Sequence, residues 1–488
     1  DTRTSALRLD SKTASLYYPN VFTIANINMS SSAYIEESDD ARRQMQSFFA
    51  MAQLGYKESL YLDVTARNDW SSTLAFTERK SRGFFYPSVG LSWIIPKSFS
   101  MPSLISFGKV RASWSKVGND IPLFVSNTVG HIAAGGIPQP NDTAPFGTLK
   151  PEMSSSFEIG TEWKFFDYRM DVDLTFYKTN TKNQLFSLPS SAGAAYKYYF
   201  VNAGNIQNMG VELTLGAVPI LTNQFKWNTT LNFSRNKNEV KKLHDDLASF
   251  IQGDEGFSSS YTMRLVEGGS FGDIYGKAFE RDKYGAIVYG RDGLPQEIGS
   301  GNTAKVGNCN PAFLLGWGNS FTYKDFSFYF LIDGHFGGDV LAQTQAVLDQ
   351  TGVSKVSGET RTMGYVDLEG HHIYNIKGFY EQVGGRNGVT EYYMYDATNI
   401  RLRELSLGYT LPKRLLGRKQ FVKKAELSFV ARNLFFIYKK ASDILKMPKK
   451  EQDIKISEIY ENLLPYRVLE NGCIAEWDHD LPEADPQH

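Results

Sequence analysis

Residues 168–177 read Tyr168-Arg169-Met170-Asp171-Val172-Asp173-Leu174-Thr175-Phe176-Tyr177, and apolar and polar side chains alternate along them. Successive side chains of a β-strand point to opposite faces, so one face of this segment is apolar and the other is charged. Residues 157–165 alternate in the same way. Only Phe166-Asp167 lies between the two runs, which is short enough for a tight hairpin. The pair therefore predicts two antiparallel strands of an amphipathic sheet.

The same alternation recurs in about twelve segments. They lie near residues 44–54, 58–69, 84–95, 107–117, 156–165, 168–180, 209–217, 225–236, 313–323, 326–336, 398–410 and 425–434. Some connections are a few residues long, whereas four are long and polar, at roughly 118–154, 181–208, 237–312 and 337–397. Short turns at one end and long loops at the other are typical of outer-membrane barrels, not of soluble sandwiches. The pattern predicts an all-β fold: the antiparallel wall of a transmembrane β-barrel with long extracellular loops.

The composition agrees with a membrane barrel. The 488 residues include 27 Tyr and 33 Phe, yet the mean hydropathy is only −0.33. A polar lumen under a thin lipid-facing coat with aromatic girdles would have this composition. Rings near the edges of the alternating runs are predicted to form the girdles, with ordinary core packing as the alternative. These rings are Trp70, Tyr86, Trp93, Trp114, Trp163, Trp227, Trp317 and Tyr323.

Other function classes find little support. No apolar run approaches the eighteen residues that a transmembrane helix needs. A net charge of −1 does not indicate a nucleic-acid partner. His371 and His372 follow Asp367 and Glu369 without further ligands at metal spacing, and the two cysteines, Cys309 and Cys473, are far apart. The sequence therefore predicts no catalytic site, metal or cofactor, and a protein that is not an enzyme.

Several stretches resemble the SusC/RagA branch of the TonB-dependent transporters. They are residues 18–22, 61–74, 85–90, 109–114, 149–152, 202–212, 397–409 and 431–434, in the expected order over about 15–440. The resemblance implies a barrel of 22 strands in the bacterial outer membrane, with a plug inside it. It also implies energy from the TonB–ExbB–ExbD complex and a SusD-like surface lipoprotein that hands over oligosaccharide or peptide.

About twelve strands cannot close a barrel of that size, because closure fixes strand number, tilt and shear together. We therefore expect residues 1–441 to be a partial barrel, with the plug and the TonB contact in a missing N-terminal part. Residues 442–488 lose the alternation and are predicted to be a non-barrel tail. Residues 472–480 and 485–488 of this tail resemble part of an α-L-fucosidase-type glycoside hydrolase, and a divergent acidic tail is the alternative. Glu476, Asp478 and Asp480 are interpreted as solvated acids, not as catalytic groups.

Substrate binding is predicted from rings and polar groups in or beside the long loops. Aromatic faces suit sugar C–H groups, and planar polar groups suit hydroxyls. The candidates are Tyr196, Tyr198, Tyr199, Tyr392, Tyr393, Asp339 and Arg401, with Asp396 as a further polar partner. Packing between loops, or contact with the lid lipoprotein, is the alternative for the rings.

Alternation also places charged residues on the lumen side: Arg111, Asp171, Asp173, Glu212 and Arg403. We expect these side chains to form an internal ladder of charges or to hold the plug. The leading functional hypothesis is an outer-membrane importer of oligosaccharides or peptides. A passive porin-like barrel and a fragment fused to a glycoside hydrolase remain the alternatives.

Overall fold

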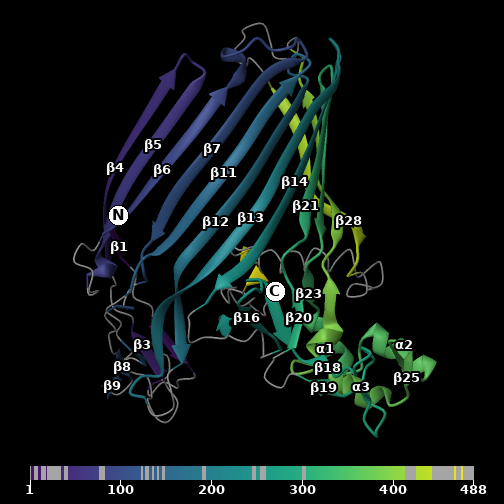
Figure 1. Ribbon diagram of the computed structural model, residues 1–488. Helices are drawn as coiled ribbons and strands as arrows, with labels where there is room; N and C mark the ends of the chain where they lie inside the picture. The colour runs from purple at the N-terminus through teal and green to yellow at the C-terminus, as the bar shows by residue number, and fades with distance from the viewer. Residues whose placement is uncertain are drawn as a thin grey trace.

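A computed structural model of the chain describes residues 42–75, 83–122, 149–189, 194–243, 260–298, 304–412 and 425–441, with short pieces of the remaining stretches. Each predicted alternating segment is a strand of one antiparallel sheet (Figure 1). In order these are β4 (Arg42–Tyr56), β5 (Leu60–Ser71), β6 (Gly83–Ile94), β7 (Ile105–Asn119), β11 (Glu152–Phe165), β12 (Met170–Pro189), β13 (Tyr198–Leu221), β14 (Phe225–Lys242), β21 (Phe313–Tyr323), β22 (Phe326–Phe336), β27 (Asn399–Thr410) and β28 (Glu426–Lys439).

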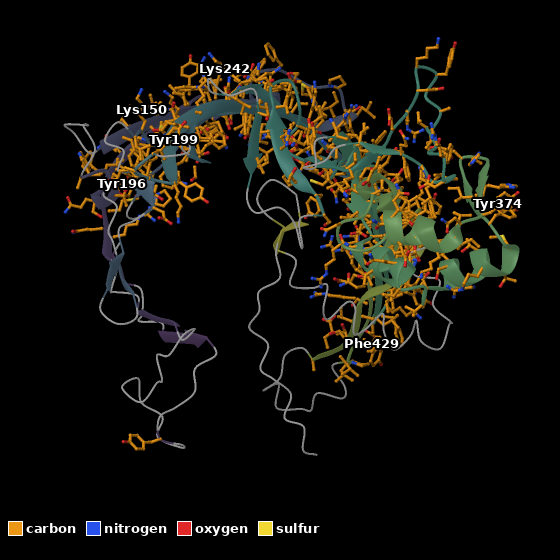
Figure 2. All side chains as sticks on the ribbon, turned by 90° about the horizontal axis from the view of Figure 1, so that it is seen from below. Lys150, Tyr196, Tyr199, Lys242, Tyr374 and Phe429 are labelled. Carbon is orange, nitrogen blue, oxygen red and sulfur yellow. The ribbon has the colours of Figure 1, made fainter. Side chains whose placement is uncertain are left out.

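Two short strands complete this sheet. β1 (Thr2–Thr4) pairs with β4, and β10 (Thr143–Ala144) pairs in parallel with β13. Within the described residues the strand order runs from β1 to β28 without closing. Seen from the loop end, the sheet is an open arc (Figure 2). The prediction of a partial barrel wall is confirmed.

The short turns lie together at the top of Figure 1. Between β11 and β12, Phe166, Asp167 and Tyr168 have φ angles of 53°, 55° and 64°. Lys324, between β21 and β22, has a φ of 52°. Left-handed backbone reverses the chain within a few residues. The tight hairpin predicted at Phe166-Asp167 is confirmed, and β21 and β22 are joined by a turn that is also short.

The register fixes which side chains share a face. Leu174 lies opposite Thr161 on β11 and Leu213 on β13, whereas Asp173 lies opposite Glu162 and Thr214. We call the face of Leu174 the outward face and the face of Asp173 the lumen face. The predicted alternation therefore describes the two sides of the barrel wall.

The loop predicted at 181–208 is mostly strand, so its predicted boundaries are wrong. β12 and β13 remain paired up to Pro189 opposite Tyr198. The alternation of apolar and polar side chains is lost here, because apolar side chains of both strands pack together in a local core, which we call the second core. This core lies outside the apolar band of the membrane. Its buried members are Phe186, Leu188, Val201, Ala203, Ile206, Val240, Leu243 and Leu265.

The other long connections fold into a loop layer at the bottom of Figure 1. Its helices are α1 (Gln343–Gln350), α2 (Lys355–Met363) and α3 (Ile376–Val383), together with a 3₁₀ turn at Thr390–Tyr393. Two further 3₁₀ turns, at Ser72–Leu74 and Ile95–Lys97, lie elsewhere in the chain. Its short strands are β15 (Ser249–Gln252), β16 (Thr262–Val266), β17 (Asp273–Gly276), β18 (Ala278–Phe279), β19 (Glu297–Ile298), β20 (Ala304–Asn308), β23 (Asp339–Leu341), β24 (Val366–Leu368), β25 (His371–Ile373) and β26 (Met394–Asp396).

Further short strands pair two by two. These are β2 (Leu9–Lys12) with β3 (Tyr34–Glu37), β8 (His131–Ala133) with β9 (Ile137–Gln139), and β29 (Arg467–Val468) with β30 (Ile474–Ala475). Apart from the last pair, the predicted tail at 442–488 lies outside the described residues. In the part of the chain that is described, no helix has the length and apolar character to span a membrane.

Candidate functional site

An arginine on the lumen face spans three strands. Arg111 of β7 donates to both carboxylate oxygens of Asp173 on β12, at 3.0 and 2.7 Å, and to the Thr175 hydroxyl at 2.6 Å. β11 lies between β7 and β12, and Gly160 is the residue crossed. A Cβ there would lie 2.7 Å from Arg111 Nε, so glycine leaves the space for the guanidinium. Arg111 and Asp173 thus form one step of the expected charge ladder.

A second charged cluster contains the predicted substrate residue Arg401. It donates to both carboxylate oxygens of Asp333, its neighbour on β22, at 2.6 and 2.9 Å. Arg403 donates to the same carboxylate at 3.0 Å. Bidentate pairs of this kind fix the planes of both groups. Arg401 is therefore held in place by the wall itself, and its substrate role stays a prediction.

A neutral group, which we call the amide patch, lies further toward the loops on the lumen face: Tyr177, Asn208, Asn236 and Asn238. The Asn208 side-chain oxygen accepts from Asn236 and Asn238, each at 3.0 Å. The Tyr177 hydroxyl donates to Asn236 at 3.2 Å. The backbone N–H of Phe271 donates to Asn238 at 2.7 Å, which joins the patch to the loop layer. Sequence reasoning missed this patch, although Asn236 and Asn238 alternate along β14.

The first predicted ring group lies where β12 and β13 end. Tyr196 and Tyr198 are 38% and 46% exposed, so both rings are open to a ligand. Tyr199 instead packs against the second core. Figure 2 places Tyr196 and Tyr199 on one limb of the arc and Tyr374 of the loop layer on the other. The two predicted ring groups are thus carried by different clusters of the structure.

The second ring group is part of the loop-layer core. Tyr393 is only 1% exposed, and Tyr392 packs edge-on against it at 4.9 Å and against Phe379 at 5.3 Å. Tyr393 presents no ring face to a substrate here, which favours the packing alternative for this residue. The ring is buried because it packs in the same core as Val383, Val389 and other apolar side chains.

A buried carboxylate holds this core together. Asp349 is 2% exposed and accepts from Tyr393 Oη at 3.0 Å, Gln345 Nε2 at 2.6 Å and the Ser354 hydroxyl. Burial raises the pKa of Asp349, and the three hydrogen bonds oppose that shift. Burial, together with the Asp349 carboxylate, also raises the pKa of Tyr393. Asp349 thus ties α1 to the start of α2 and to the 3₁₀ turn at Thr390–Tyr393.

The raised pKa predicts a pH dependence of the loop layer. The folded state binds the Asp349 proton more tightly than the unfolded chain, so this contribution is largest below about pH 4. It declines as the pH rises from there through the raised folded pKa. Hydrogen exchange of α1 and α3 in the full-length protein should show protection falling over this window, and Asp349→Asn should flatten the change. An exposed control, Asp367→Asn, should keep the wild-type profile; an identical profile in Asp349→Asn would contradict the assignment.

The remaining predicted carboxylates have structural partners. Asp339 and Asp396 lie opposite each other on β23 and β26. Asp339 accepts from the Asn308 backbone at 2.9 Å. Asp396 accepts from Lys440 at 2.7 Å and from the Thr398 hydroxyl at 2.5 Å, and these bonds lower the pKa of Asp396 to about 2. Asp396 thus anchors the loop layer to the strand ends, whereas Asp339 bonds within the loop layer.

The two histidines stack on tyrosines. His371 lies 4.0 Å from the Tyr289 ring, and His372 lies 4.0 Å from the Tyr365 ring. Among the described residues, no three His, Cys, Asp or Glu side chains are grouped so as to hold a metal ion. The carboxylates at 476, 478 and 480 lie outside the described residues.

Comparison with known proteins places this wall in a family. Residues 5–290 match the family described as TonB dependent receptor-like, beta-barrel. The chain belongs to this family. It is an outer-membrane protein that crosses the membrane with strands, as the SusC/RagA resemblance implied.

Curated relatives of this TonB-dependent receptor barrel are themselves named TonB-dependent receptors. The TonB-dependent receptor P3 of Formosa agariphila is 26% identical over 80% of the chain and 40% of its own length. The TonB-dependent receptor SusC of Bacteroides thetaiotaomicron is 22% identical over 78% of the chain and 40% of its own length. The chain thus spans about 40% of these curated relatives. The RagAB peptide importer has the same fold, with a TM-score of 0.67 and 18% identity over 87% of this chain and 46% of that one.

Proposed function

We propose that the parent receptor imports oligosaccharides by TonB-dependent uptake after a SusD-like surface lipoprotein hands them over. The observation that carries this proposal is the match of residues 5–290 to the TonB-dependent receptor barrel. Energy would come from the TonB–ExbB–ExbD complex through a contact outside the barrel wall. The proposed role is transport, and the chain's residues bind and position a substrate without catalysing a reaction.

The amide patch supports an uncharged, hydroxyl-rich substrate. Planar amides such as Asn208 and Asn236 both donate and accept, so each can pair with sugar hydroxyls. The exposed rings of Tyr196 and Tyr198 offer faces for sugar C–H groups at the loop end of the wall. Peptide import is the second candidate, because the Arg401 and Asp333 pair could meet the charged ends of a peptide.

Uptake by a strain that carries or lacks the parent gene tests the proposal. Labelled neutral oligosaccharides and peptides of similar size would be supplied in turn, with and without a protonophore. We expect uptake of an oligosaccharide that needs both the gene and the proton gradient. Gene-dependent uptake that survives the protonophore would identify a passive pore instead, and uptake of peptides alone would establish the second candidate.

The amide patch gives a sharper test. Replacing Asn208 and Asn236 by alanine removes two neutral hydrogen-bonding groups, each worth about 0.5–1.5 kcal/mol. The affinity of the full-length receptor for its oligosaccharide should fall roughly tenfold in calorimetry. The matched control is Asn180→Ala with Asn205→Ala, an amide pair on the outward face that is bonded at 3.0 Å. Equal losses in both pairs would contradict lumen-side binding.

A further inference from the structure

Basic side chains gather on the outward face beyond the apolar band. We call five of them the basic collar: Lys116, Lys178, Lys182, Arg235 and Lys237. All five are exposed, and they come from β7, β12 and β14. Register shows that they share the outward face. Lys178 lies opposite Phe157 and Met209, and Met209 lies opposite Lys237.

The collar begins where the apolar outward face ends. Along β12, the outward residues change from Leu174 and Phe176 to Lys178. Along β7, Lys116 follows Trp114 on the same face. Trp114 is 39% exposed, and amphipathic rings of this kind lie at the headgroup level of a membrane. Phosphate-bearing lipids present their charge at this level.

The depth of the collar agrees with the thickness of a membrane. β14 starts at Phe225, and Lys237 is 12 residues further along. At about 3.3 Å per residue and a tilt of about 40°, the rise along the membrane normal is about 30 Å. An apolar band is about 25 Å tall, so Lys237 reaches the outer headgroup region. Lysine side chains can extend a further few ångströms toward that region.

The collar carries excess positive charge that the protein itself does not neutralise. Glu239 is the acidic residue that shares the outward face here, and Lys237 and Lys241 bond to it at 3.0 and 2.5 Å. In the described part of the chain, no carboxylate forms an ion pair with the other four members of the collar. The lumen face of the same strand segments carries Ser154, Ser156, Thr179, Thr181 and the asparagines of the amide patch.

We propose that the basic collar is a binding site for a phosphorylated glycolipid headgroup of the outer leaflet. The cations would bind the phosphate groups, and Asn180, Asn205 and Gln207 between them could pair with headgroup sugar hydroxyls. Lys178 and Lys237 are two strands apart, a spacing of about 10 Å that suits two phosphates on one headgroup. This proposal rests on the membrane location of the barrel and not on the identity of the imported substrate.

The test measures binding of fluorescent diphosphorylated lipid A to the full-length receptor in neutral detergent. Each lysine near an anionic lipid surface contributes about 1 kcal/mol, so Lys178→Gln with Lys237→Gln should weaken binding roughly 10- to 30-fold. The control, Lys57→Gln with Lys324→Gln, removes the same charge from the short turns at the other end. The control should bind like the wild type. Heat-modifiable migration in gels establishes that each variant is folded.

Two further ligands show whether the bound phosphate belongs to the lipid or is a free anion. Dephosphorylated lipid A should bind weakly and equally to the wild type and the collar variant. Inorganic phosphate at the same concentration as the lipid should not compete. Equal binding by the wild type and the collar variant would overturn the proposal, as would an equal loss in the control. Competition by inorganic phosphate alone would also overturn it, because a free anion site would then explain the binding.

Discussion

Replacing Leu174 with arginine is expected to abolish stable insertion of the receptor into membranes. Leu174 is 41% exposed on the outward face, in a row with Thr161 and Leu213. An arginine near the midplane of a barrel's lipid face costs about 2–4 kcal/mol. This cost is a large part of the net stability of a typical fold. Folding of the full-length receptor into lipid vesicles, followed by urea titration, measures the loss.

A lumen-face control separates the effect of the outward position from the effect of the added charge. Asn232 of β14 lies opposite Thr214, which in turn lies opposite Asp173, so Asn232 is on the lumen face one residue row from Leu174. Asn232→Arg adds the same group on the lumen face of the same stretch of wall and should insert normally. Asp171→Asn, also on the lumen face, should be tolerated as well. Failure of Asn232→Arg, or normal insertion of Leu174→Arg, would show that the facing assignment is wrong.

The wall of the barrel could be predicted from sequence because period-two alternation survives wherever lipid covers one face and water the other. This condition holds at Leu174 and Asp173, where β11 ends and β12 begins within two residues of the predicted positions. It fails at Phe186 and Leu188, where the strands leave the membrane and pack on a local core. The sequence therefore predicts a loop at 181–208, where the structure has a long hairpin.

The candidate site was harder to predict, because contacts between distant segments decide it. Tyr392 and Tyr393 look alike in sequence, yet Tyr393 is buried against Asp349, which lies 44 residues away. The amide patch depends on Asn208 and Asn236 meeting across β13 and β14. Asp333 is the partner of Arg401 because β22 pairs with β27, and this pairing cannot be deduced from either segment alone. Alternation gives the face of each residue but not its partner.

Replacing Phe379 with alanine is expected to unfold the helical part of the loop layer and leave the barrel intact. Phe379 of α3 is fully buried and meets Tyr380 and Tyr392 edge-on, each at 5.3 Å. Truncation of a buried phenylalanine costs about 3–5 kcal/mol, through lost burial and the cavity left behind. This core is small, so a loss of that size exceeds what its other contacts can offset.

Limited proteolysis and hydrogen exchange of the full-length receptor would measure the effect of Phe379→Ala. Amides of α1 and α3 should lose protection, and new cleavage sites should appear between residues 343 and 393, whereas the heat-modifiable migration of the barrel persists. The control, Tyr374→Ala, removes a ring that is 75% exposed and should change protection little. The lipid-facing strands share few side chains with the core of the loop layer, so the loop layer is expected to unfold independently. A barrel that unfolds together with the helices would contradict this expectation.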